Sequence, residues 1–277
     1  GHTGLLGLTR HIVLPGYAGY LGTPVASLYP DNATVADQAH AQGGLMGYVH
    51  PFDSYPDPAD TTTALNNELP VDVALGKLGY FEVVGFSDHL ITSRVWYQLL
   101  NCGFRLPAGA GTDAMTNFAS LRGPVGTNRV YVQSGLPLDR ARWYGALKAG
   151  KTFATNGPLL RFTLQGQGPG GQVPAGIGRL TARITLRSLV PLDHLELIGN
   201  GRVVATIPLT GDRMSADTVL TVDVGANRWF VLRAYADQAV TPVLDLYPFA
   251  TTSPVYVGGG TEAASCGADA EYFLRWL

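Results

Sequence analysis

The stretch LMGYVHPFDSY, residues 45–55, ends an apolar run on a histidine and a proline. Its Leu, Met, Tyr and Val side chains are typical of a strand that is buried on both faces, as in a parallel sheet. Pro51 has no N–H to donate, so pairing stops there and His50 lies at the carboxyl end of the strand. Ligands and metals bind at that edge in α/β proteins. From this stretch alone, His50 is either a site residue or an ordinary strand-end histidine.

Apolar strands and helical patterns alternate on both sides of this stretch, up to about residue 156. The strands are expected at residues 5–8, 45–50, 80–86, 105–114, 128–133 and 151–157. The helices are expected at residues 31–44, 71–77, 92–103 and 138–150, with Asn32 as the N-cap of the first. Such alternation predicts parallel βα units in residues 1–156.

The pattern changes in residues 157–277 to alternating strands that are separated by turn signals. These strands are expected at residues 159–166, 179–189, 193–209, 218–225 and 227–237. The Asn200–Gly201 pair is typical of a two-residue hairpin turn. The sequence therefore predicts an α/β chain whose second domain is an antiparallel β-sandwich. A short amphipathic helix closes it, with Tyr272, Phe273 and Trp276 on one side.

Composition excludes several classes of protein. Hydrophobic residues make up 46% and charged residues 14%, as in a well-buried globular protein. A net charge of −2 and a pI near 6.3 indicate no charged surface for binding nucleic acid or an anionic membrane, and no apolar stretch has the length of a transmembrane helix.

Cys102 and Cys266 are too few for a disulfide scaffold, and a single bridge between them is not favoured. Localisation stays open between the cytoplasm and export.

Three strand ends in the first domain carry residues that bind metals. His2 stands at the entry to the first strand, His50 ends the second, and Asp113 follows the strand that ends in AGAGT. Imidazoles and carboxylates from separate strands are the ligands that a divalent ion needs. Gly109 and Gly111 are expected to let the backbone turn so that Asp113 faces this edge. Alternatively, Asp113 is a turn or cap residue, and Gly1–His2 is a cloning remnant.

Several motifs together resemble the carbaryl-hydrolase-like (CehA/McbA) metallohydrolases of the PHP superfamily, which is named for polymerase and histidinol-phosphatase domains. They are GHTGLLGL, AHAQGGLMGYVHPF, LPAGAGTDA, RGPVGTNRVYV and GKTFATNGPLL, in that order. The resemblance covers nearly the whole chain, through the closing DAEYFLRWL. It implies a PHP-type (β/α) barrel in residues 1–156, with divalent ions bound at the carboxyl ends of its strands.

The resemblance also implies the roles of individual residues. His2, His50 and Asp113 match metal ligands, and the ion is Zn, Mn or Fe. Where many superfamily members have a histidine two residues after the aspartate, this chain has Met115, which argues against a third metal. The family opens with an HxH strand and a bridging glutamate that would lie ahead of Gly1. The barrel is therefore expected to be partial, and a partner chain or a longer protein to supply these strands.

Three further residues are candidates for contacts with a small-molecule substrate. Tyr48 alternates with His50 and either lines the same edge or belongs to the core. His89 in GFSDHL follows a strand end, where it is a substrate contact or, with Asp88, part of a helix cap. Arg122 in LRGPVG is an anchor for an anionic group or a surface ion-pair residue.

The expected function is metal-dependent hydrolysis of an ester, carbamate, amide or phosphoester bond. His50 and Asp113 are the expected catalytic residues, Asp113 both as a ligand and as a proton carrier. The sequence has no Gly-x-Ser-x-Gly elbow, P-loop or dinucleotide-binding glycine pattern that indicates another reaction. The alternative is a non-catalytic binding or structural protein in which the sandwich is the working part and the PHP scaffold is degenerate.

Overall fold

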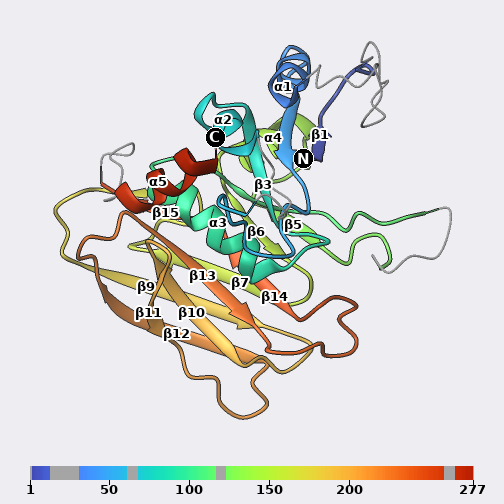
Figure 1. Ribbon diagram of the computed structural model, residues 1–277. Helices are drawn as coiled ribbons and strands as arrows, with labels where there is room; N and C mark the ends of the chain where they lie inside the picture. Colours follow the sequence, from blue (N-terminus) through green and yellow to red (C-terminus); the bar gives the residue numbers. More distant parts are fainter. Residues whose placement is uncertain (1, 13–30, 61–67, 117–122, 259–265, 277) are drawn as a thin grey trace.

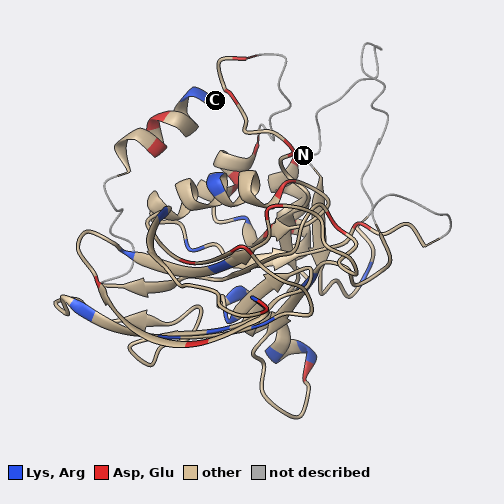
Figure 2. Ribbon diagram, turned by 90° about the horizontal axis from the view of Figure 1, so that it is seen from below, with Lys and Arg blue, Asp and Glu red and all other residues tan. Residues whose placement is uncertain are grey.

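The structure is a computed structural model that describes residues 2–12, 31–60, 68–116, 123–258 and 266–276. Its fold is mixed α/β with several sheets, and the strands described do not close into a barrel. The helices of the described residues are too short and too polar to cross a bilayer. Figure 2 shows acidic and basic residues spread along the ribbon, in keeping with the formal net charge of −2.

The first sheet carries the candidate site. It has four strands in the order β1 (Thr3–Leu6), β2 (Leu45–Tyr48), β3 (Leu78–Val84) and β4 (Ala108–Ala110). Strands β2, β3 and β4 are parallel, as the alternation of strands and helices predicts, whereas β1 is antiparallel to β2. The helices of this region are α1 (Asn32–His40), α2 (Leu69–Ala74), α3 (His89–Asn101) and α4 (Arg140–Lys148).

Aspartates cap three of these helices. The carboxylates of Asp31, Asp88 and Asp139 each accept a hydrogen bond from the backbone N–H three residues on, at 2.7, 2.8 and 2.7 Å. A side-chain acceptor at this position satisfies an amide that the helix itself leaves unpaired. The predicted N-cap of the first helix, Asn32, is wrong by one residue, because Asp31 has the extended backbone of a cap.

The large sheet crosses the domain boundary predicted at residue 156. Its main path runs β11 (Arg202–Thr206), β10 (His194–Gly199), β13 (Trp229–Tyr235), β14 (Phe249–Thr252), β6 (Thr152–Thr155) and β5 (Arg129–Val132), with β8 (Gln172–Val173) and β15 (Val255–Val257) beside it. Strands β5 and β6, expected among the parallel βα units, are antiparallel to each other, and β6 pairs with β14. Residues 1–156 and 157–277 therefore share one sheet and are not separate in the structure.

A third sheet packs on one face of the large sheet. It contains β12 (Ser215–Asp223), β9 (Arg179–Arg187) and β7 (Leu159–Leu164), all antiparallel. Alternate residues of β9 are buried, and with alternate residues of β13 they belong to one apolar core. The members from these two strands are Leu180, Ala182, Ile184, Leu186, Phe230, Leu232 and Ala234. Period-two alternation in both strands thus gives each sheet an apolar face that packs against the other.

The opposite face of the large sheet is covered by helices, as Figure 1 shows for α3 and α5 (Gly267–Trp276). Trp229 and Val231 of β13 belong to the same core cluster as Phe273 and Trp276 of α5. The predicted amphipathic C-terminal helix is confirmed, because its apolar side is the buried one. Cys102 and Cys266 are free thiols, and burial, together with the neighbouring Cys266 thiol, raises the pKa of Cys102 to about 12.

Candidate metal centre

The carboxyl ends of β2 and β4 bring His50 and Asp113 to one edge of the first sheet. His50 comes two residues after β2, and Asp113 comes three residues after β4. Because β1 is antiparallel to β2, the start of β1 adjoins the end of β2, and the Val49 N–H donates to the carbonyl of His2 at 3.3 Å. The topology thereby brings His2 to the same edge.

The side chains of these three residues approach one another. Nδ1 of His2 lies 3.0 Å from Nε2 of His50, and the two imidazole rings are nearly perpendicular at 89°. The same Nε2 of His50 lies 3.8 Å from Oδ2 of Asp113. The His50 and Asp113 side chains are 22% and 35% exposed, so a small molecule in solution reaches them. The structure thus brings together the residues that the sequence singles out as metal ligands.

His50 and Asp113 both have a left-handed backbone, with φ of 35° and 54°. A residue with a Cβ pays for this conformation with roughly 1–3 kcal/mol when it persists, and such residues gather at functional sites. His and Asp are among the non-glycine residues that most often adopt it. Two such residues facing each other at one sheet edge support a functional role for this edge.

Glu82 of β3 is a member of this cluster that the sequence analysis missed. Its carboxylate accepts the backbone N–H of His50 at 2.8 Å, and the residue is only 4% exposed. Burial raises the pKa of Glu82 to about 8; the His50 N–H opposes this rise, and the charge of Asp113 adds to it. An acidic residue inside the apolar stretch YFEVVGF was the signal available in the sequence.

Glycines make room for the Glu82 carboxylate. A Cβ on Gly85 would lie 2.0 Å from Oε1 of Glu82, and one on Gly111 would lie 2.4 Å from Oε2. Gly109 and Gly111, expected to let the backbone turn towards Asp113, both lack a positive φ, and Gly109 lies within β4. Gly109 instead leaves space for Tyr80, whose ring carbon would lie 2.6 Å from an added Cβ. Both glycines permit close packing across the sheet.

The donor set suits a divalent ion of the zinc or manganese type. Imidazole nitrogen and carboxylate oxygen are ligands of such ions, and two donors on one tetrahedral ion lie roughly 3.3–3.6 Å apart when each is about 2.0–2.2 Å from it. The observed pair distances of 3.0 and 3.8 Å fall on either side of this spacing. Within the described ranges, no group of three or more His, Cys, Asp or Glu side chains is placed so that it could hold a metal ion. His2, His50 and Asp113 thus lie near one another without forming such a group.

Tyr48 is a core residue in the structure and does not line this edge, which corrects its assignment as a substrate contact. It is 0% exposed, and its hydroxyl donates to Asp72 at 2.8 Å while it accepts from Asn32 at 2.9 Å. Burial, with the hydrogen bond to Asp72 and the nearby carboxylates, raises the pKa of Tyr48. Its ring faces away from solvent and ties β2 to α1 and α2.

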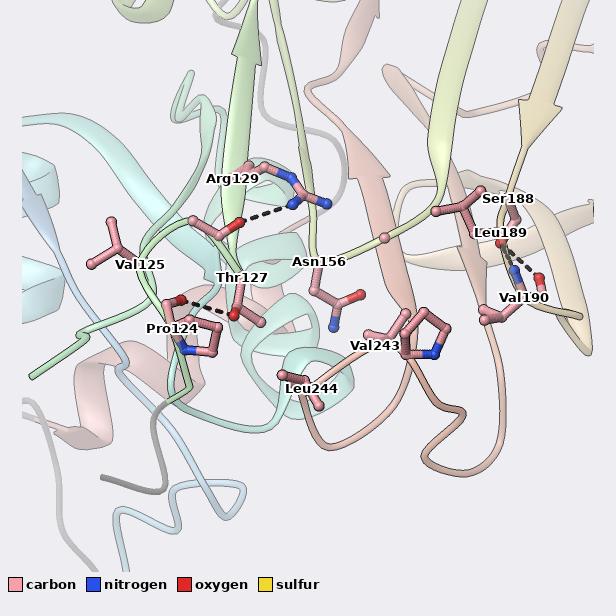
Figure 3. A pocket seen from close by; sticks show the side chains of 13 residues that line it. Pro124, Val125, Thr127, Arg129, Asn156, Ser188, Leu189, Val190, Val243 and Leu244 are labelled. Atoms are coloured by element: carbon pink, nitrogen blue, oxygen red, sulfur yellow. Dashed lines mark hydrogen bonds between the residues drawn. The ribbon is translucent and has the colours of Figure 1, made fainter. Parts of the chain in front are cut away.

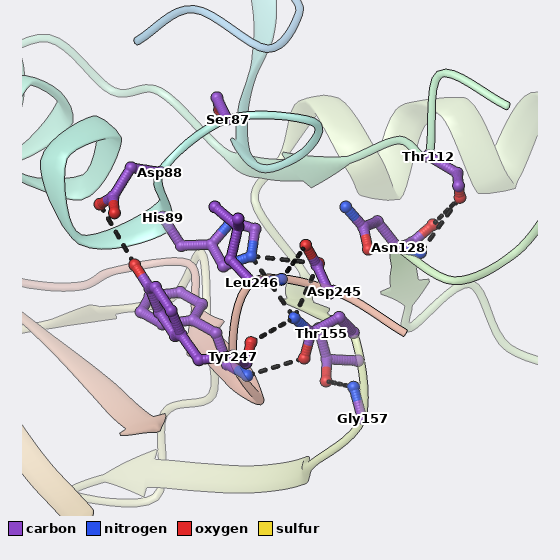
Figure 4. Close-up of polar contacts among 12 residues, drawn as sticks. Ser87, Asp88, His89, Thr112, Asn128, Thr155, Gly157, Asp245, Leu246 and Tyr247 are labelled. Atoms are coloured by element: carbon purple, nitrogen blue, oxygen red, sulfur yellow. Dashed lines mark hydrogen bonds and ion pairs between the residues drawn. The ribbon is translucent and has the colours of Figure 1, made fainter. Parts of the chain in front are cut away.

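His89 is likewise buried and makes no surface that a substrate reaches. Its Nε2 lies 3.1 Å from Oδ2 of Asp245, and Asn156 donates to the same oxygen at 2.8 Å (Figure 4). Burial favours a higher pKa for Asp245, but the hydrogen bonds and charge of His89, with the Asn156 bond, outweigh it and lower the pKa. The helix-cap alternative holds for this segment, with Asp88 as the cap.

Arg122 lies outside the described residues, so its assignment as a substrate anchor has no counterpart in the structure. Comparison of the chain with models of protein families, with curated proteins and with solved structures finds no match. These comparisons identify no family. The resemblance to the CehA/McbA metallohydrolases accordingly rests on the sequence motifs, and the site rests on the geometry of His2, His50, Glu82 and Asp113.

Proposed function

We propose that this chain is a metal-dependent hydrolase of the PHP type that cleaves an ester, carbamate, amide or phosphoester bond in a small molecule. The observation that carries the proposal is the approach of His2, His50 and Asp113 from three separate chain segments to one sheet edge. The resemblance of the sequence motifs to CehA/McbA enzymes supports the same class. A single strand-end histidine would not support it.

His2, His50 and Asp113 would hold the divalent ion, which is zinc, manganese or iron. When bound, such an ion lowers the pKa of a water and supplies a hydroxide nucleophile near neutral pH. The protein orients His50 through the hydrogen bond from its backbone N–H to Glu82. Asp113 accepts a proton at its carboxylate and passes it to solvent, to which it is open at 35% exposure.

Further ligands would come from a segment beyond the described residues, in the same protein or in a partner chain. Strand β1 is an edge strand of its sheet among the described strands, because it pairs there with β2 alone. An additional strand that carries an HxH pair would add beside β1 and extend the sheet. This arrangement fits the order of ligands that the family resemblance implies.

The direct test is hydrolysis of aryl-ester, aryl-carbamate and aryl-phosphate probes with and without divalent metal. Hydrolysis should depend on metal, and supplying an HxH segment, in cis or as a second chain, should raise the rate. His50→Ala should abolish that activity. A complemented protein that binds no metal would favour the alternative function, a non-catalytic binding protein.

A further inference from the structure

A cavity of about 310 Å³ lies between three loops that are far apart in the sequence (Figure 3). One wall is residues 124–127, before β5; the second is residues 188–190, between β9 and β10; the third is residues 242–244, before β14. Arg129 and Asn156 also line it. This volume is at the lower end of the range for small-molecule sites.

Arg129 contributes a guanidinium that has no acidic partner among the described residues. Nη1 donates to the carbonyl of Gly126 at 2.9 Å, but the buried Nε has no hydrogen-bond partner. No aspartate or glutamate is among the lining residues of the cavity. A half-buried guanidinium with unused N–H groups loses hydration without compensation, so an oxyanion that accepts from it gains a strong interaction.

The mouth of the cavity is apolar. Val125, Leu189 and Leu244 line it and are 74%, 86% and 60% exposed, although each side chain is large and hydrophobic. Exposed apolar side chains that surround one cavity are typical of a binding site, whereas isolated ones are not. The ligand that fits both ends has an apolar body and one anionic head.

Hydrogen bonds of the Thr112 hydroxyl connect the segment beside the cavity to the candidate metal centre. Thr112, which precedes Asp113, accepts a hydrogen bond from the N–H of Asn128 at 3.1 Å and donates to its carbonyl at 3.3 Å. Asn128 directly precedes Arg129. The hydrogen-bonded pair of Thr112 and Asn128 (Figure 4) therefore joins the segment that carries Asp113 to the segment that carries Arg129.

We propose that this cavity binds the anionic group of the substrate, a carboxylate or a phosphate on an apolar small molecule, with Arg129 as its anchor. The assignment as a substrate site rests on the proposed hydrolase function, but binding of the anion does not require metal. Metal-free protein therefore tests the cavity independently of hydrolysis. Benzoate and phenyl phosphate are the probes, and benzamide and benzylamine are the neutral and cationic controls of similar shape.

The experiment is titration calorimetry of the chelator-treated full chain with each probe. Benzoate or phenyl phosphate should bind, and whichever binds more tightly identifies the head group; benzamide and benzylamine should bind at least about tenfold more weakly. Arg129→Gln should weaken anion binding by at least about tenfold, and Arg129→Lys by less, because lysine keeps the charge and loses the planar fork. Arg202→Gln, at an exposed arginine of β11, is the matched control and should change nothing.

A second variant avoids any structural role of Arg129. Leu189 is 86% exposed, so Leu189→Asp adds a negative charge at the mouth without disturbing the core. It should weaken anion binding, and Leu189→Asn should do so much less. Equal affinity for benzoate and benzamide, no binding of either anion, or anion binding unaffected by both Arg129→Gln and Leu189→Asp would overturn the proposal. A protein that binds these anions but never hydrolyses an ester would contradict only the hydrolase function.

Discussion

Nε2 of His50 lies 3.8 Å from Oδ2 of Asp113, and both residues have a positive φ, 35° and 54°. The two residues follow different strands of one sheet, β2 and β4. Strain at two facing residues is expected where the positions of the side chains matter more than local stability. This relationship separates the cluster from an accidental meeting of polar residues at a sheet edge.

Replacing either strained residue with glycine should separate stability from metal binding. We expect His50→Gly and Asp113→Gly to keep the free energy of unfolding of the metal-free protein within about 1 kcal/mol of wild type, because glycine adopts a positive φ without strain. Both should lose metal affinity. Urea unfolding and metal titration measure the two effects. Gln165→Gly, at another positive φ of 50°, is the control and should keep metal affinity. A loss of several kcal/mol at His50 with unchanged metal affinity would assign it a structural role.

The space beside the Glu82 carboxylate predicts a coupled pair of substitutions. Gly111→Ala places a Cβ 2.4 Å from Oε2 of Glu82 and should destabilise the protein by about 1–3 kcal/mol. The cost should fall in a Glu82→Ala background, where the carboxylate is absent, and a double-mutant cycle by urea unfolding measures this coupling. Gly145→Ala in α4, where an added Cβ meets nothing within 4 Å, should instead be neutral or stabilising. Strict additivity of Gly111→Ala and Glu82→Ala would show that the two sites do not interact.

The buried pair of His89 and Asp245 predicts a dependence of stability on acid. The folded-state pKa of Asp245 is lowered below its ordinary value of 3.8. The ionised carboxylate therefore contributes to the free energy of unfolding above that pH, and this contribution is lost as the pH falls through the lower, folded-state pKa. The free energy of unfolding should therefore decline below about pH 4, and Asp245→Asn should make this decline shallower. Urea unfolding from pH 2 to 7 measures it, with Asp223→Asn at an exposed ion pair as control. An unchanged acid slope in Asp245→Asn would refute the linkage.

The last helix should contribute to stability through one face only. Trp276 and Phe273 are 6% and 7% exposed in the core that α5 shares with α3 and β13. Substitution of either by alanine should cost about 3–5 kcal/mol, whereas Leu274→Ala, at 68% exposure, should stay within about 0.5 kcal/mol. Thermal or urea unfolding distinguishes the two classes. Equal effects at the three positions would mean that α5 does not pack as described.

The features of the site that depend on residues close together along the chain were predictable. An apolar strand that ends in His-Pro, and a second strand that ends near Asp113, bring both side chains to the carboxyl edge of a parallel sheet, and the structure has them there. Glu82 was missed because its mid-strand carboxyl needs the space left by Gly85, which follows the same strand, and by Gly111, which follows β4. That space depends on register, which alternation of residues does not specify.

Other errors have the same origin in long-range contacts. Strands β5 and β6 have the pattern of βα units, yet β6 pairs with β14, which comes about a hundred residues later in the chain. Tyr48 and His89 both carry polar groups near strand ends, but their partners Asp72 and Asp245 draw them into the interior. The period of apolar residues and the spacing of cap residues locate strands and helix ends well. Which strand or side chain each one pairs with depends on tertiary packing.

Metal binding tests the central claim most directly. The measurement is titration of Zn²⁺ and Mn²⁺ into wild type, His50→Ala, Asp113→Ala and a control, His194→Ala. His194 lies on β10, far from the cluster in sequence, and its imidazole pairs with Asp237. Wild type and His194→Ala should bind with equal affinity, and loss of either cluster ligand should weaken binding by more than about 100-fold, beyond what neighbours of a ligand contribute. Equal affinity of all four proteins would contradict the assignment of His50 and Asp113 as ligands.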